Sequence, residues 1–109
     1  MGIKASKLKF VEAVQDGNLP RVTEMIAAGM NPNIQGNNGF RPLFFVFPSA
    51  TADVARALLA AGADPNTRLQ DLSTPLYFAV RLENSAFTQV LLQAKADPNA
   101  RVENDKPIV

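Results

Sequence analysis

Apolar residues recur along the chain with the spacing of short helices. One stripe holds Leu43, Val46 and Phe47, and the next holds Val54, Leu58 and Leu59. Residues three to four positions apart fall on one face of a helix, and the polar residues between them fall on the opposite face. The pattern therefore predicts pairs of short helices that each bury one side.

The pattern repeats every 33 residues. Its markers are Asn31-Pro32-Asn33, Asp64-Pro65-Asn66 and Asp97-Pro98-Asn99. Apolar positions keep the same register, as in Met25, Leu58 and Leu91. A fixed period of this length is typical of solenoids built from stacked repeats. We expect a single domain over residues 1–109, with units at about 5–34, 35–67 and 68–100 and a partial fourth unit at 101–109.

Residues that favour helix starts precede the predicted helices. Pro42 and Pro75 suit the first turn of the first helix in a unit, where a missing N–H costs nothing, and Thr74 can cap the helix that begins at Pro75. The residues that precede the second helices at equivalent positions are Asn18, Thr51 and Asn84. Their side-chain oxygens can accept hydrogen bonds from the free N–H groups of the first turn.

Glycine marks two of the three helix ends. Gly29 and Gly62 lie where the second helix of a unit must end, and glycine adopts the left-handed conformation of such an end without steric conflict. Lys95 takes the equivalent position in the third unit. We therefore expect the third unit's second helix to end less cleanly than the other two.

The 33-residue unit resembles the ankyrin repeat. The resemblance rests on Ser73-Thr74-Pro75-Leu76 at the opening of one helix and Gly62-Ala63-Asp64-Pro65-Asn66 at the close of another, together with the period. It implies an all-α solenoid of stacked helix-turn-helix units with β-turn finger loops. It also implies a non-catalytic module that binds another protein through a concave face, formed by the fingers and the exposed edge of each first helix.

Several residues depart from the pattern of that family. Phe44 and Tyr77 stand where the family usually has histidine, and Arg41 replaces the usual threonine in the second unit. We expect aromatic packing by Phe44, Phe45 and Phe47 to replace the missing side-chain hydrogen bonds. The loop glycine, present as Gly39, becomes Leu72 in the next unit, which predicts a different turn geometry in that second finger.

Composition narrows the classes of function. Eleven basic and ten acidic residues leave a formal net charge of +1, without the excess positive charge that nucleic acids or anionic membranes attract. Without histidine or cysteine, the usual catalytic triads and zinc sites cannot be assembled. Asp64 and Asp97 recur once per repeat, as structural turn residues do. We expect no enzyme activity, no cofactor and no metal; an enzyme that uses carboxylates alone is the catalytic alternative.

The sequence also suggests where the protein resides. No segment approaches the roughly 18 apolar residues of a membrane span, and the N-terminus lacks the apolar region of a signal peptide. We expect a cytoplasmic, monomeric protein with no membrane or nucleic-acid partner.

The two ends of the array differ in sequence. Glu12 stands where the later units have Phe45 and Phe78, which fits an end repeat whose outer face meets water. Residues 101–109 reproduce a finger and the opening of another helix. Either the array continues beyond Val109, or residues 107–109 fold back as a minimal cap.

The resemblance places a partner on the finger tips and the first-helix edges. The corresponding residues here are Asn37, Asn38, Phe40, Pro48, Ser49, Arg68, Gln70, Asp71, Ser73, Arg81 and Leu82. Phe40, Arg68 and Arg81 are the expected anchors, since aromatic and arginine side chains dominate binding hot spots. Packing against the neighbouring finger is the alternative for Phe40, and simple solvation is the alternative for each arginine. A structural segment that packs against other domains of the same chain is the alternative function.

Overall fold

The computed structural model describes residues 3–35, 41–45, 52–69 and 72–99. This part of the chain forms helices only, in three pairs, as the periodicity predicts. The helices are α1 (Ile3–Gln15), α2 (Leu19–Ala27), α3 (Pro42–Phe45), α4 (Ala52–Ala60), α5 (Pro75–Arg81) and α6 (Ser85–Gln93).

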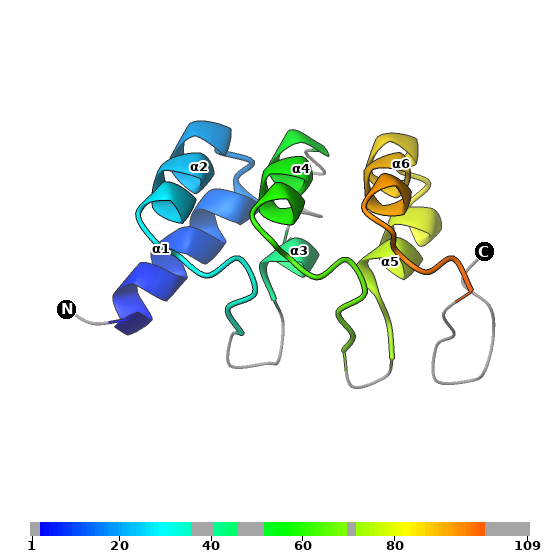
Figure 1. Cartoon of the computed structure of the whole chain (residues 1–109), viewed down its shortest axis with the longest axis horizontal. Coiled ribbons are helices and arrows are strands. Elements are labelled where there is room, and N and C mark those ends of the chain that lie inside the picture. Colours follow the sequence, from blue (N-terminus) through cyan, green and yellow to red (C-terminus); the bar gives the residue numbers. More distant parts are fainter. Residues whose placement is uncertain (1–2, 36–40, 46–51, 70–71, 100–109) are drawn as a thin grey trace.

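The helix pairs stack side by side along the long axis of the molecule, which measures 43 × 26 × 21 Å. Helices α1, α3 and α5 form one row and α2, α4 and α6 form the other (Figure 1). Each second helix packs on the second helix of the next pair, α2 on α4 and α4 on α6. The architecture is the expected all-α stack of helix-turn-helix units.

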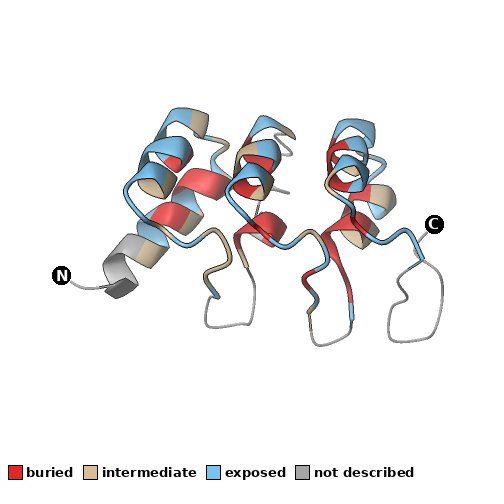
Figure 2. Cartoon of the chain, viewed as in Figure 1, coloured by how far each residue is buried: buried red, intermediate tan, exposed pale blue. Residues whose placement is uncertain are grey.

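The core lies where the helices face one another (Figure 2). Its most deeply buried large side chains are Phe10, Val14, Val22, Leu43, Val54, Leu58, Leu76, Phe87 and Leu91. Phe44 is 6% exposed, and its ring packs edge-on against Phe78 with 5.9 Å between ring centroids. This confirms the expected aromatic packing for Phe44, whereas the side chain of Phe45 and all of Phe47 lie outside the described residues.

The predicted helix starts are confirmed where the structure describes them. The Oδ1 atoms of Asn18 and Asn84 accept hydrogen bonds from N–H groups in the first turns of α2 and α6, at 3.2 and 3.0 Å. The Thr74 hydroxyl accepts one from the Tyr77 N–H at 3.2 Å, just ahead of Pro75. Thr51 lies outside the described residues.

The second helices all end in the same way, which corrects the expectation for the third unit. Gly29, Gly62 and Lys95 have φ values of +106°, +105° and +73°. The N–H of Ala63 donates to Leu58 across the end of α4, and the N–H of Ala96 donates to Leu91 across the end of α6, both at 2.9 Å. The two helix ends therefore have the same hydrogen bonds. Lys95 adopts the left-handed conformation that glycine adopts at the other two ends, and the contact of its Cβ with the backbone destabilises that conformation.

Replacing Lys95 by glycine should therefore stabilise the protein. We expect a gain of about 0.5–1 kcal/mol in the free energy of unfolding, because the left-handed conformation loses its steric cost. The reverse change, Gly62→Ala, should cost a similar amount, since no atom lies within 4 Å of the added Cβ and only the backbone is strained. Urea-induced unfolding measures both changes, and a loss of stability in Lys95→Gly would contradict the account.

A similar conformation occurs in the finger of the third unit. Leu72 has a φ of +70°, in the region that favours glycine, and its N–H donates to the carbonyl of Leu69 at 2.9 Å. The Leu69 N–H donates in turn to the carbonyl of Ser73 at 2.9 Å, which closes the loop. Leu72 thus keeps a glycine-like backbone; Gly39, needed to compare the two fingers, lies outside the described residues.

Asparagine side chains tie each unit to the next. The Asn33 amide donates from Nδ2 to the carbonyl of Gly62 at 2.9 Å, and its Oδ1 accepts from the N–H of Asp64 at 2.8 Å. Asn66 makes the same two bonds to Lys95 and Asp97, at 3.3 and 2.7 Å. The last asparagine of the first two markers therefore links its unit to the next. We call these bonds of Asn33 and Asn66 the asparagine ladder; they fix the spacing between units.

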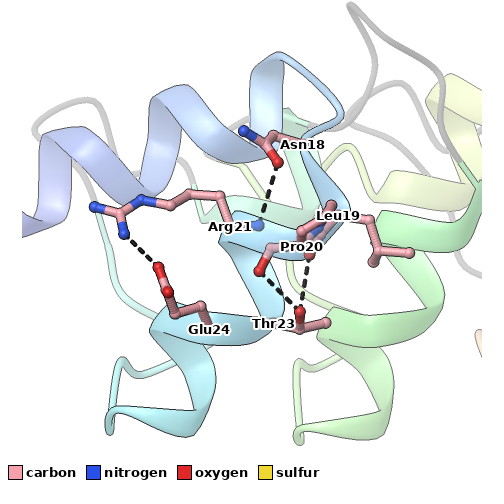
Figure 3. Close-up of polar contacts among 6 residues, drawn as sticks. All are labelled: Asn18, Leu19, Pro20, Arg21, Thr23 and Glu24. Carbon is pink, nitrogen blue, oxygen red and sulfur yellow. Dashed lines mark hydrogen bonds and ion pairs between the residues drawn. The ribbon is translucent and has the colours of Figure 1, made fainter.

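Helix α2 of the first unit carries charged residues on one side. Arg21 and Glu24 form an ion pair on the side of α2 that faces away from α4 (Figure 3). The equivalent positions in α6 hold Phe87 and Val90, which are buried. Glu12, the residue expected on an outer face, is exposed as well. At these three positions the first unit has charged residues where the third unit has Phe78, Phe87 and Val90.

Candidate functional site

Four of the eleven predicted surface residues lie in the described part of the chain. They are Arg68, Ser73, Arg81 and Leu82, all in the third unit. The other seven lie outside the described residues: Asn37, Asn38, Phe40, Pro48, Ser49, Gln70 and Asp71. The described part of the candidate surface therefore lies on the finger and the first helix of the third unit.

Ser73 does not belong to this surface. It is 2% exposed, and its carbonyl accepts the hydrogen bond from Leu69 that closes the finger. The next residue, Thr74, is equally buried because it caps α5. The chain therefore turns inward at Ser73 to start the helix, which buries the Ser73 side chain and removes it from the exposed surface.

Arg81 is held against an aromatic ring at the end of α5. Its guanidinium carbon lies 5.6 Å from the centroid of the Tyr77 ring, one helical turn earlier. The Tyr77 ring packs edge-on against Phe78, with 5.5 Å between centroids, and Phe78 packs edge-on against Phe44 of the second unit. A row of rings therefore connects an exposed cation to the packed interior.

Leu82 and Arg68 complete the described part of the surface. Leu82 follows Arg81 as the C-cap of α5 and is 60% exposed, although its backbone is fixed by a hydrogen bond to the carbonyl of Phe78. Arg68 is exposed on the finger and follows the buried Thr67. The described part of the candidate surface thus holds one large exposed apolar side chain and two exposed arginines.

Four of the five arginines in the described residues fall into two groups, and Arg41 belongs to neither. On the second helices, Arg21 pairs with Glu24 and Arg56 pairs with Asp53, each within its own helix. On the candidate surface, neither Arg68 nor Arg81 forms an ion pair with any residue that the structure describes. The second-helix charges are internally balanced, whereas these two are not.

An open hollow lies at the far end of the stack, and the sequence analysis did not name the residues that line it. It has a volume of about 690 Å³ and is lined by Val80, Glu83, Ser85, Thr88, Gln89, Leu92 and Gln93. The 33-residue register could have located it, because the positions equivalent to Thr88 are Val22 and Ala55, both fully buried beneath the following unit. The hollow is the side of the third unit on which no described unit packs.

Across the described ranges, no group of three or more acidic, histidine or cysteine side chains is placed to hold a metal ion. None of the described helices is both long and apolar enough to cross a membrane. Asp64 and Asp97 each accept a hydrogen bond at 2.9 Å from the N–H two residues on. These two carboxylates therefore shape turns between units.

The helix pairs, the ladder between them and the exposed finger surface define a helical repeat solenoid, a class that generally serves in protein–protein interaction. More specifically, the chain belongs to the ankyrin repeat family, since the family model "Ankyrin repeats (3 copies)" matches residues 10–102. None of the curated proteins compared with the chain matches it.

Proposed function

We propose that this chain is a non-catalytic recognition module that binds a protein partner through the concave face, at its finger loops and first-helix edges. It acts as a single domain over residues 1–109, monomeric and cytoplasmic, with units at about 5–34, 35–67 and 68–100 and a partial fourth unit. The observation that carries the proposal is the exposed pair Arg81 and Leu82 on a fixed backbone, with Arg81 anchored on Tyr77.

Preorganisation supports this function. Binding costs free energy when side chains and loops must be ordered, and a surface that is already fixed avoids much of this cost. The ladder made by Asn33 and Asn66 fixes one unit against the next, and the backbone bonds of Leu69 close the finger that carries Arg68. These bonds support the proposal of a preformed binding surface.

A pull-down tests the proposal. The triple variant Phe40→Ala, Arg68→Glu, Arg81→Glu should lose a partner that the wild-type chain captures from source lysate, because it removes the three anchors. Quantitative mass spectrometry measures the captured proteins, and circular dichroism checks that the variant folds. Recovery of the same proteins by both chains would contradict recognition through this face.

A structural role is the second candidate, and the hollow at the end of the stack favours it. Leu92 is 43% exposed there, whereas its equivalents Ile26 and Leu59 pack against the core beneath the next unit. The hollow therefore lies at the repeat positions through which the first two units contact the unit that follows them. In this function, another segment of the same protein covers Leu92 and its neighbours.

Placing a charge in the hollow separates the two candidates. In residues 1–109 alone, Leu92→Glu should change the free energy of unfolding by less than about 0.5 kcal/mol, because the residue is half exposed. In the protein isolated from its source, a covered hollow would bury this carboxylate and lower the unfolding temperature. Leu8→Glu, at a site that is 60% exposed on α1, is the matched control. Equal, small effects in both forms would contradict the structural role.

A further inference from the structure

We infer that the partner presents a carboxylate beside an apolar side chain, so that Arg81 and Leu82 bind an acidic peptide segment and Arg68 adds a second cationic contact. This inference rests on the proposed function, because it concerns the ligand of the same surface.

The orientation of Arg81 carries the first step. The guanidinium carbon of Arg81 lies 5.6 Å from the Tyr77 ring centroid, within reach of a cation–π contact, and the exposed group carries five N–H donors. Those groups match the two oxygens of a carboxylate in a planar, bidentate arrangement. The contact with Tyr77, whose ring packs on Phe78, restricts the Arg81 side chain and so lowers the ordering cost of binding.

The distribution of charge carries the second step. Arg21 and Arg56 are neutralised within their own helices, so a partner's carboxylate gains little there. Arg68 and Arg81 have no acidic partner among the described residues, and both are exposed in the third unit. Glu83, the acidic residue nearest to Arg81 in sequence, lines the hollow at the end of the stack. Within the described residues, Arg68 and Arg81 are therefore available to an acidic group of a partner.

The apolar neighbour and the net charge identify the class of ligand. Leu82, 60% exposed beside Arg81, offers an apolar contact that a nucleic-acid phosphate backbone cannot use. The formal net charge of +1 is too small for the multiple phosphate contacts that dominate nucleic-acid affinity. An acidic residue next to an aliphatic or aromatic one in a peptide satisfies both features.

Selection from a displayed library of random peptides tests this inference on the intact chain. Peptides that bind the wild-type chain should be enriched in Asp or Glu next to an apolar residue. Synthetic versions should lose about tenfold in affinity with Arg81→Gln, and similarly when the peptide's Glu is replaced by Gln. Arg56→Gln removes an equivalent exposed charge from α4 and should leave affinity unchanged, while Tyr77→Leu should weaken binding several-fold with Arg81 still present.

Each other outcome overturns the inference. Peptides without acidic enrichment, or a selection that yields no binder, would exclude an acidic ligand. If peptide affinity were unchanged by Arg68→Gln and Arg81→Gln but lowered by Leu82→Ser, the acidic ligand would be wrong and the proposed function would stand. Insensitivity to all of these variants would overturn both. Displacement of the peptide by a single-stranded oligonucleotide at lower concentration than by free acidic peptide would indicate a nucleic acid instead.

Discussion

Replacing Phe87 by alanine is expected to lower the free energy of unfolding by about 3–5 kcal/mol, the largest effect of any single change considered for this chain. The ring is fully buried in the core, at the start of the second helix of the third unit. Its removal takes away the apolar contacts of the ring and leaves a cavity that the short α5 and α6 cannot close. Urea-induced unfolding followed by circular dichroism measures the change.

Leu92→Ala is the matched control for Phe87→Ala. It also removes a large apolar side chain from α6, but Leu92 is 43% exposed, so the cost should stay near or below about 1 kcal/mol. Similar losses of unfolding free energy in the two variants would contradict the conclusion that Phe87 is buried and Leu92 is half exposed. Because each unit contacts only its neighbours, the weakest interface should melt first in Phe87→Ala, and the transition should broaden.

Replacing Asn66 by alanine is expected to have the second largest effect, a loss of about 1–2 kcal/mol. The change removes two hydrogen bonds, to the carbonyl of Lys95 and from the N–H of Asp97, and a typical bond contributes about 0.5–1.5 kcal/mol net. The lower end reflects the exposure of both groups, which lets water replace the amide. Thermal and urea unfolding measure the loss.

Asn99→Ala supplies the control for the ladder. Asn99 occupies the same repeat position as Asn33 and Asn66, but its side-chain amide makes no hydrogen bond to any described residue. Its loss should change stability by only a few tenths of a kcal/mol. An equal loss in Asn66→Ala and Asn99→Ala would show that the amides act within their own turns and do not link the units.

Much of this fold could be predicted from the sequence because every unit repeats the same physical solution. The apolar register placed Leu58 and Leu91 in the core, and the capping residues Asn18 and Asn84 marked helix starts that the structure confirms. The family resemblance is likewise confirmed over residues 10–102. These features depend on local sequence and on one period, so they can be read without knowledge of distant contacts.

The parts that could not be predicted depend on neighbouring units and on backbone strain. Lys95 was expected to weaken the end of α6, yet the hydrogen bond from Ala96 to Leu91 holds it in the glycine conformation. Ser73 seemed exposed because it lies next to a finger tip, but the turn into α5 buries it. The hollow beside Leu92 was not located, although Thr88 is equivalent to the buried Val22 and Ala55, because its shape depends on how α5 and α6 pack.

The most direct test of recognition through the finger and first-helix surface compares two charge-reversed variants of equal size. One carries Arg68→Glu and Arg81→Glu on the candidate surface, and the other carries Arg21→Glu and Arg56→Glu on the second helices, with folding of both checked by circular dichroism. A quantitative pull-down from source lysate should show that the first variant loses a partner retained by the wild-type chain and by the second variant. Equal retention by both variants, or loss by the second alone, would contradict the central claim.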